Sequence, residues 1–306
     1  MSTLVVIGEA MLELREKDAC SLHKSFAGDV LNTAVYAKRF DQDLSVEFMT
    51  GVGQDNYSQQ LVAQCQQYGV GTQYMWQHPQ ANIGIYSINT DSTGERFFTY
   101  WRKGSAASKI IELLDGQNSL EFSSDTVIYF SGISLAILSD EDKDKLLAYL
   151  NTYQQQGLKI AFDPNYRERL WRDKQHAQSY FDKCYALADI LLPGLDDHQT
   201  LYGHTSPEAI EAYIKPFGYQ ELIIKAGKAG VFGFSTNEQC HIPFKAAPKQ
   251  VDATAAGDSF AGTYMAARLQ GLAVEQAISH ACDVARVVVQ FPGAILDPQL
   301  DIAQYM

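Results

Sequence analysis

Short runs of consecutive apolar residues alternate along the chain with longer segments of helical spacing. Five runs predict strands that are buried on both faces, at residues 4–7, 126–131, 159–162, 189–192 and 222–225. Helices are predicted at residues 140–156, 173–187 and 207–216. This alternation indicates an α/β fold, with a mostly parallel sheet covered by helices on both faces. Functional residues are expected directly after strands, because binding sites in such sheets lie beyond the carboxyl ends of the strands.

Residues 11–26 and 82–101 depart from this alternation, because both are alternating or rich in aromatic residues and have no helix within them. They predict the strands of a small separate sheet that covers the site as a lid. The alternative is a pair of extra edge strands on the main sheet. Neither an internal repeat nor a linker rich in Pro, Gly or Ser interrupts the sequence. We therefore expect a single domain over residues 1–306, with the lid inserted into it.

The charge balance argues against two classes of partner. With 24 Lys and Arg against 36 Asp and Glu, the 306-residue chain carries a net charge of −12. Such a surface repels nucleic-acid phosphates and anionic lipid, so we expect neither nucleic-acid nor membrane binding. A few well-placed Arg side chains could still bind an anionic small molecule.

The cysteines and the N-terminus indicate a cytoplasmic protein. The five Cys are scattered and form no C-x-x-C pair, so neither a disulfide framework nor a zinc site is expected. Met1 leads into an apolar run without a basic region or a cleavage pattern, and no apolar run reaches the roughly 18 residues of a membrane span.

The strongest chemical feature is Asp252-Ala-Thr-Ala-Ala-Gly-Asp258, which precedes a predicted helix. Small residues at 255–257 let the backbone approach a ligand, and the free N–H groups of a first helical turn bind anions. A carboxylate here would repel a phosphate, unless it accepts the proton of an attacking hydroxyl. Asp258 is therefore a candidate general base. The alternative is that it only caps the helix.

Two motifs together resemble the PfkB, or ribokinase-like, family of sugar kinases. Asp252-Ala-Thr-Ala-Ala-Gly-Asp-Ser-Phe260 is similar to the family's C-terminal signature, and Phe26-Ala-Gly-Asp-Val-Leu-Asn-Thr-Ala34 resembles its sugar-binding turn. The resemblance extends over the whole chain. It implies a ribokinase-like three-layer α/β/α sandwich with a small β-sheet lid, and a kinase that uses ATP and Mg²⁺.

Within the family, the sequence most resembles the 2-keto-3-deoxygluconate kinases. The resemblance lies in residues 28–36, 90–96, 100–102, 131–139 and 163–171. It implies phosphorylation of 2-dehydro-3-deoxy-D-gluconate at its 6-hydroxyl. Two alternatives remain open: another kinase of this fold, such as a fructokinase or a nucleoside kinase, and a non-catalytic sugar-binding regulator. A regulator would have no need of Asp258.

The resemblance also implies a role for individual residues. Those of the sugar pocket are Gly28, Asp29, Asn32, Tyr86, Tyr100, Arg102 and Arg167. Those of the ATP site are Lys225, Gly227, Gly230, Ala255, Ala256 and Gly257. The two Arg residues suit a sugar acid, because a guanidinium binds a planar carboxylate through two parallel hydrogen bonds. Read alone, each Arg could be a surface residue, and residues 225–230 could be an ordinary glycine-rich turn.

One departure from the family concerns the metal. Many members have an N-x-x-E motif that helps to organise magnesium, whereas this chain has Gly194 in place of the Asn and Asp197 in place of the Glu. Asp197 is thus the candidate magnesium residue, and its alternative role is as a charge at a helix N-terminus. We also expect a homo-oligomer, a dimer, because an exposed lid sheet tends to find a partner.

Overall fold

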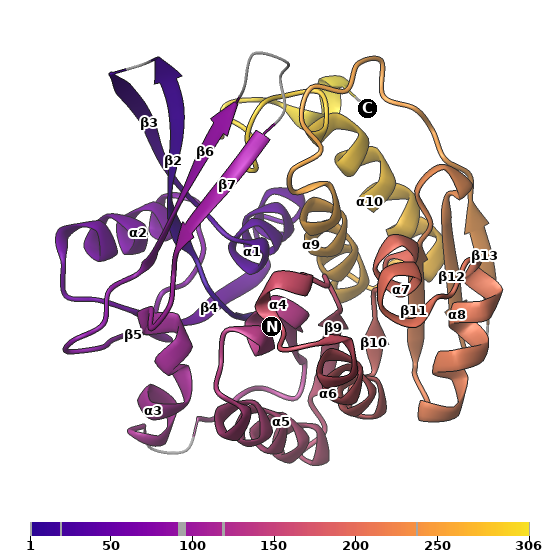
Figure 1. Ribbon diagram of the computed structural model, residues 1–306. Helices are drawn as coiled ribbons and strands as arrows, with labels where there is room; N and C mark the ends of the chain where they lie inside the picture. The colour runs from indigo at the N-terminus through magenta and orange to yellow at the C-terminus, as the bar shows by residue number, and fades with distance from the viewer. Residues whose placement is uncertain (1, 19, 91–95, 118–119, 237, 306) are drawn as a thin grey trace.

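The computed structural model describes residues 2–18, 20–90, 96–117, 120–236 and 238–305 (Figure 1). In this part of the chain, nine strands form a central sheet. Their order across the sheet is β13 (Gln239–Ile242), β12 (Val231–Ser235), β11 (Glu221–Lys225), β10 (Ile190–Leu191), β9 (Lys159–Asp163), β8 (Thr126–Ser131), β1 (Thr3–Ile7), β4 (Ser45–Val52) and β5 (Met75–Gln77). Neighbouring strands are parallel except at one edge, where β12 pairs antiparallel with β11 and β13. The predicted mostly parallel sheet is confirmed.

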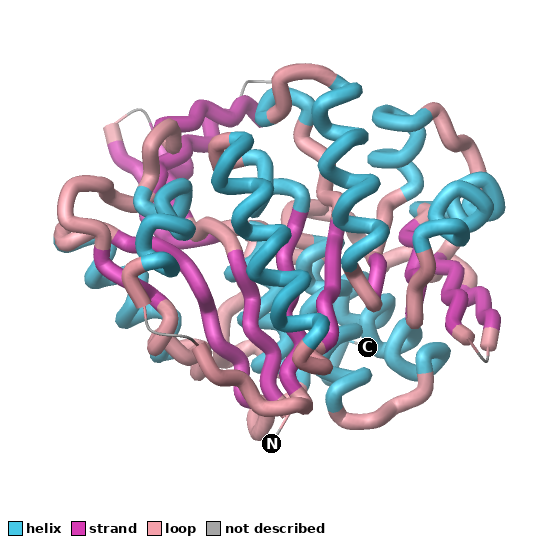
Figure 2. The backbone as a smooth tube through the Cα atoms, turned by 90° about the horizontal axis from the view of Figure 1, so that it is seen from below, coloured by secondary structure: helices cyan, strands magenta, loops and turns pink. Residues whose placement is uncertain are grey.

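Helices cover both faces of this sheet, as Figure 2 shows from below. One layer consists of α1 (Asp29–Phe40), α2 (Asn56–Gln67), α9 (Ala256–Leu269) and α10 (Val274–Val288). The other consists of α3 (Ile110–Asp115), α4 (Gly132–Ala136), α5 (Asp140–Gln155), α6 (Lys174–Leu187), α7 (Leu195–Tyr202) and α8 (Pro207–Ile214). Side chains of β1 alternate between the two cores: Leu4 and Val6 pack in the first layer, and Val5 and Ile7 in the second. The fold is therefore the predicted three-layer sandwich.

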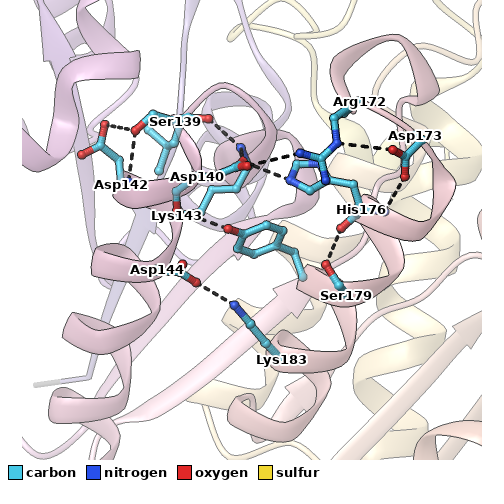
Figure 3. Close-up of polar contacts among 12 residues, drawn as sticks. Ser139, Asp140, Asp142, Lys143, Asp144, Arg172, Asp173, His176, Ser179 and Lys183 are labelled. Carbon is cyan, nitrogen blue, oxygen red and sulfur yellow. Dashed lines mark hydrogen bonds and ion pairs between the residues drawn. The ribbon is translucent and has the colours of Figure 1, made fainter.

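Polar contacts on the outer surface join α5 to α6 (Figure 3). Ser139 caps the first turn of α5. The ring Nε2 of His176 lies 3.0 Å from the Asp140 carboxylate, and the Lys183 ammonium donates to Asp144 at 2.7 Å. Exposed pairs of this kind add at most about 1 kcal/mol each. They connect two neighbouring helices.

The two segments that broke the alternation form a sheet of their own, drawn at the upper left of Figure 1. Its strand order is β3 (Ser21–Ala27), β2 (Met11–Asp18), β6 (Gly84–Thr90) and β7 (Arg96–Trp101). The alternative of extra edge strands on the main sheet is therefore wrong. Residues 91–95, part of one stretch that carries the family resemblance, lie outside the described residues. We call these four strands the small sheet.

The cysteines form no disulfide bonds among the residues that the structure describes. All five are free thiols, with Cys65 and Cys184 buried and Cys20 exposed. Within the described ranges, no helix is long and apolar enough to cross a membrane.

Close packing of α1 against α9 places an N-terminal and a C-terminal segment of the chain side by side. Gly262 of α9 lies against the backbone of α1, where a Cβ would overlap the carbonyl oxygen of Thr33. Only glycine allows this approach. The contact matters for function because α1 begins at Asp29 and α9 contains Asp258.

Replacing Gly262 by alanine is expected to lower the free energy of unfolding by about 1–3 kcal/mol, because the added methyl group must push α9 away from α1. Urea denaturation measures this loss. Gly116→Ala is the matched control, since Gly116 has an ordinary φ of −77° and a Cβ there would meet its nearest neighbour at 3.4 Å. An equal loss in both variants would contradict the packing argument.

Candidate active site

The candidate site lies where the carboxyl ends of β1, β8 and β9 meet the beginning of α1. The next strands of the central sheet along the chain, β4 after β1 and β9 after β8, lie on opposite sides of this pair. Such a switch point is where α/β sheets bind ligands. Asp29, the first residue of α1, points into this region. Its Oδ2 accepts a hydrogen bond from Ser131 Oγ at 2.5 Å and another from Asn165 Nδ2 at 3.0 Å. The last residue of β8 and a residue just beyond β9 therefore hold one carboxylate of the predicted sugar pocket.

Asp258 lies beside this carboxylate, in the first turn of α9. The amide of Asn32 donates a hydrogen bond of 2.8 Å to its Oδ2, so two residues that are 226 positions apart meet as the motifs imply. Burial, and then the negative charge of Asp29, raise the pKa of Asp258 to about 7. Asp163 acts in the same direction, and Arg167 and the Asn32 hydrogen bond oppose the rise. A carboxylate with this pKa is an effective proton acceptor near neutral pH.

The turn before α9 presents backbone N–H groups. Ala255, the residue before the helix, is left-handed with φ of 62°, and no side chain caps the helix. An alanine in this conformation costs roughly 1–2 kcal/mol, which is strain of the kind found at ligand sites. The Lys225 ammonium lies close to Gly257 and forms an ion pair of 2.6 Å with Asp163. Free N–H groups and a cation together form a site for phosphate oxygens.

A cavity of about 590 Å³ opens beside this turn. Five of the six predicted ATP residues line it, namely Lys225, Gly227, Gly230, Ala256 and Gly257. Ala255 does not, and its contribution is the left-handed backbone that starts the turn. The remaining wall is largely apolar, with Phe244, Phe260 and Val289. A cavity of this size and lining suits a flat heteroaromatic ligand with a polar tail.

The small sheet carries the two aromatic residues of the predicted sugar pocket, Tyr86 and Tyr100. The rings of Tyr86 and Tyr100 stack with centroids 5.6 Å apart, and Tyr86 donates its hydroxyl hydrogen to Glu13. Burial raises the pKa of Tyr86 well above its usual value, so this hydroxyl stays a donor. The Arg102 guanidinium lies 5.9 Å from the Tyr100 ring centre. Tyr86 is buried whereas Tyr100 is half exposed, so the outer ring is the one open to a ligand.

The two predicted carboxylate-binding arginines differ in their surroundings. Arg102 follows β7, is 12 % exposed and forms an ion pair with the buried Glu9. Arg167 follows β9 and is exposed, and its Nη1 donates to the Tyr166 carbonyl oxygen at 3.0 Å. Its positive charge nevertheless lowers the pKa of Asp258, so it lies on the same side of the site. The arginines approach the site from different elements, one from the small sheet and one from the main sheet.

Gly28 is required by space. It precedes α1 with extended backbone, and a Cβ there would overlap the carbonyl oxygen of Glu9. The turn that carries Asp29 and Asn32 can therefore lie directly on the chain that follows β1.

Sequence reasoning singled out neither Glu9 nor Asp163 as a site residue. Glu9 lies two residues beyond the end of β1, and Asp163, the last residue of β9, directly follows the strand expected at residues 159–162. Position after a strand is therefore the signal that could have found them. Their ion-pair partners could not be predicted from local sequence, because Arg102 lies 93 positions after Glu9 and Lys225 lies 62 positions after Asp163.

The residues near Asp197 fit a magnesium ion that is held mainly by a nucleotide. Asp197 lies half buried in the first turn of α7, and burial together with the charge of Asp163 raises its pKa. Among the described residues, no group of three or more His, Cys, Asp or Glu could hold a metal ion by itself. Mg²⁺ commonly binds through one or two carboxylates, phosphate oxygens and water. Asp197 and Asp163 are suited to that role.

Asp258→Asn is expected to stabilise the protein at alkaline pH. Because folding raises the pKa from 3.8 to about 7, the wild type has its full stability only below about pH 4 and loses part of it as the pH rises through 7. The neutral Asn avoids this loss. The variant should match the wild type at pH 4 and exceed it at pH 8 by roughly 1–3 kcal/mol in urea denaturation.

The exposed Asp43 supplies the control for this titration. Asp43→Asn should follow the wild type at both pH values. A difference between Asp258→Asn and the wild type that does not change with pH would rule out the raised pKa.

Comparison with known proteins identifies the family. Residues 1–300 match the model of the pfkB family carbohydrate kinases. The chain is 36% identical to the 2-dehydro-3-deoxygluconokinase of Dickeya dadantii and 38% identical to that of Escherichia coli K12, in both cases over 96% of each chain. It also resembles the fold of a putative ribokinase II from E. coli, crystallised with ATP and Mg²⁺, with a TM-score of 0.80 and 22% identity over 96% of this chain and 94% of that one. The chain belongs to the pfkB family of carbohydrate kinases.

Proposed function

We propose that this protein transfers the γ-phosphoryl group of ATP to the 6-hydroxyl of 2-dehydro-3-deoxy-D-gluconate. The observation that carries the proposal is the position of Asp258, which lies between the cavity beside the α9 turn and the pocket residues Asp29 and Asn32. The substrate is suggested by relatives at 34–38% identity that bear the name 2-dehydro-3-deoxygluconokinase. The largely buried guanidinium of Arg102 supports a substrate with a carboxylate.

In this reaction the 6-hydroxyl oxygen attacks the γ-phosphorus, the new O–P bond forms, and the bond to the ADP oxygen breaks. Asp258 accepts the hydroxyl proton. The N–H groups of Gly257 and Asp258 and the Lys225 ammonium stabilise charge on the transferred phosphoryl oxygens. Asn32 keeps the Asp258 carboxylate oriented through the hydrogen bond at 2.8 Å.

Magnesium, when bound, neutralises charge on the nucleotide phosphates. Asp197 and Asp163 are the residues that would hold it, directly or through water. Asp163 already forms an ion pair with Lys225, so the two cationic groups would share one carboxylate.

The small sheet would act as a lid that excludes water from the transfer step. We further propose that the protein is a homodimer, since Leu22, Phe97 and Trp101 of this sheet are each more than half exposed. Its place would be the cytoplasm, because it uses ATP and all five of its thiols are free.

An ADP-release assay over a panel of sugars and sugar acids tests the function. Turnover of 2-dehydro-3-deoxy-D-gluconate well above that of fructose would support the proposal. Equal or better turnover of fructose would favour a fructokinase, and binding without turnover would favour a regulator.

Asp258→Asn is expected to lower kcat about 10²–10⁴-fold, because the amide keeps the size of the side chain but cannot accept the hydroxyl proton. The dissociation constant for the sugar acid, measured by calorimetry, should change little. A variant that retains more than about a tenth of the wild-type kcat would exclude Asp258 as the base. The expected alternative of a helix cap is already wrong, because Ala255 precedes α9 and no side chain caps the helix.

Arg102→Lys is expected to raise KM for the sugar acid at least tenfold, because an ammonium cannot form the two parallel hydrogen bonds of a guanidinium. Lysine keeps the charge that balances Glu9, so the fold should be preserved. Arg167→Lys should have a smaller effect, since Arg167 is exposed. KM for ATP is the control for a general loss of activity. An equal rise in KM for ATP in the Arg102→Lys variant would contradict a role of Arg102 in binding the substrate carboxylate.

A further inference from the structure

Glu9 lies where the small sheet joins the main body. β1 ends at Ile7 and β2 begins at Met11, so Glu9 is in the middle of a three-residue connection. Its side chain is almost completely removed from solvent, with 2 % of the residue exposed. A carboxylate is costly to bury without partners, so its contacts indicate what it does.

The Glu9 side chain has two polar partners, and both follow β7. Its Oε2 pairs with the Arg102 guanidinium, and its Oε1 accepts the hydroxyl hydrogen of Ser105. The other two connections also touch it. Gly28, after β3, packs on the Glu9 carbonyl oxygen, and a Cβ on Gly84, at the start of β6, would lie 3.0 Å from Oε1. All four connections between the small sheet and the main body therefore meet at Glu9.

Arg102 has donors that Glu9 does not use. A guanidinium has five N–H groups, and the contact with Glu9 is made through Nη2. Its Nε is buried and has no hydrogen-bond partner among the residues that the structure describes. A buried donor without a partner destabilises the protein unless a ligand satisfies it, and a carboxylate is the ligand that this group binds best.

We propose that Glu9 is a positioning residue, which holds the Arg102 guanidinium so that its remaining N–H groups meet the carboxylate of the sugar acid. The inference rests on the proposed function, which supplies the carboxylate. Because Glu9 already orders the Arg102 side chain, substrate binding does not have to supply the entropy cost of ordering it. The Glu9 charge also repels the substrate carboxylate, so its removal has two opposite effects on binding. The loss of a fixed orientation for the Arg102 guanidinium is the larger effect, because bidentate hydrogen bonding requires a fixed plane.

The test compares Glu9→Gln with the wild type on the sugar acid and on its neutral carboxamide. Gln keeps the shape and loses the charge that fixes Arg102. KM for the acid should rise at least tenfold, with kcat changed less than threefold, while KM for ATP and the affinity for the carboxamide stay within threefold. Glu16→Gln is the matched control, because Glu16 of β2 is exposed and accepts a surface hydrogen bond from Asn89.

A double-mutant cycle separates positioning from a structural role. In the Arg102→Ala background, Glu9→Gln should have no further effect on KM for the acid. An effect that persists there, or a change of less than threefold in the Glu9→Gln single variant, would overturn the inference. If the Glu9 variants do not fold, Ser105→Ala provides the same test. It should raise KM for the sugar acid at least threefold in the wild-type background and leave it unchanged in the Arg102→Ala background.

Turnover of the sugar acid by the wild type is measured before that of the variants. If it does not turn over the sugar acid, the proposed function fails and this inference fails with it. If the wild type is active but the Glu9 effects are absent, only the positioning role is excluded.

Discussion

The packing of α1 on α9 is the contact on which the site depends. It joins the first 40 residues to the last 50, and it is close enough only because Gly262 has no side chain where the helices touch. The two helices begin at the same end of the molecule, so their first turns meet there and Asn32 reaches Asp258. Separation of the helices would therefore lose the proposed proton acceptor and the predicted sugar pocket together.

The site concentrates negative charge in a small volume. Asp29, Asp163, Asp197 and Asp258 all lie there, and their mutual repulsion adds to burial in raising the pKa of Asp258 and of Asp197. Hydrogen bonds from Ser131 and Asn165 and the ion pair with Lys225 hold this charge in place. Such an arrangement makes one carboxylate a base near neutral pH and favours nucleotides that arrive with a divalent cation.

Hydrophobic pattern predicted the main sheet well, because strands buried on both faces are continuous apolar runs. The hydrophobic pattern was wrong at the ends of some strands and helices, where individual side chains determine which residue is the last. The strand expected at 189–192 is only Ile190–Leu191, because the Asp189 carboxylate accepts the Ile160 N–H in place of a backbone partner. The helix expected at 207–216 ends at Ile214, since Pro216 cannot donate the next hydrogen bond. The site residues followed from motifs, whereas the pairing of Glu9 with Arg102 requires the small sheet to be folded, which no local pattern encodes.

The small sheet is assembled from two separate parts of the chain. Its central pair, β2 with β6, is parallel and joins residues about 70 positions apart, with β3, α1, β4, α2 and β5 between them. A parallel pair over such a distance gains nothing until the intervening segment has folded. During synthesis the β2–β3 hairpin therefore waits, with the pairing edge of β2 open, until residues 84–101 have left the ribosome. For this interval the nascent chain exposes a strand edge that another chain could pair with, so the order of synthesis makes the edge of β2 prone to aggregation.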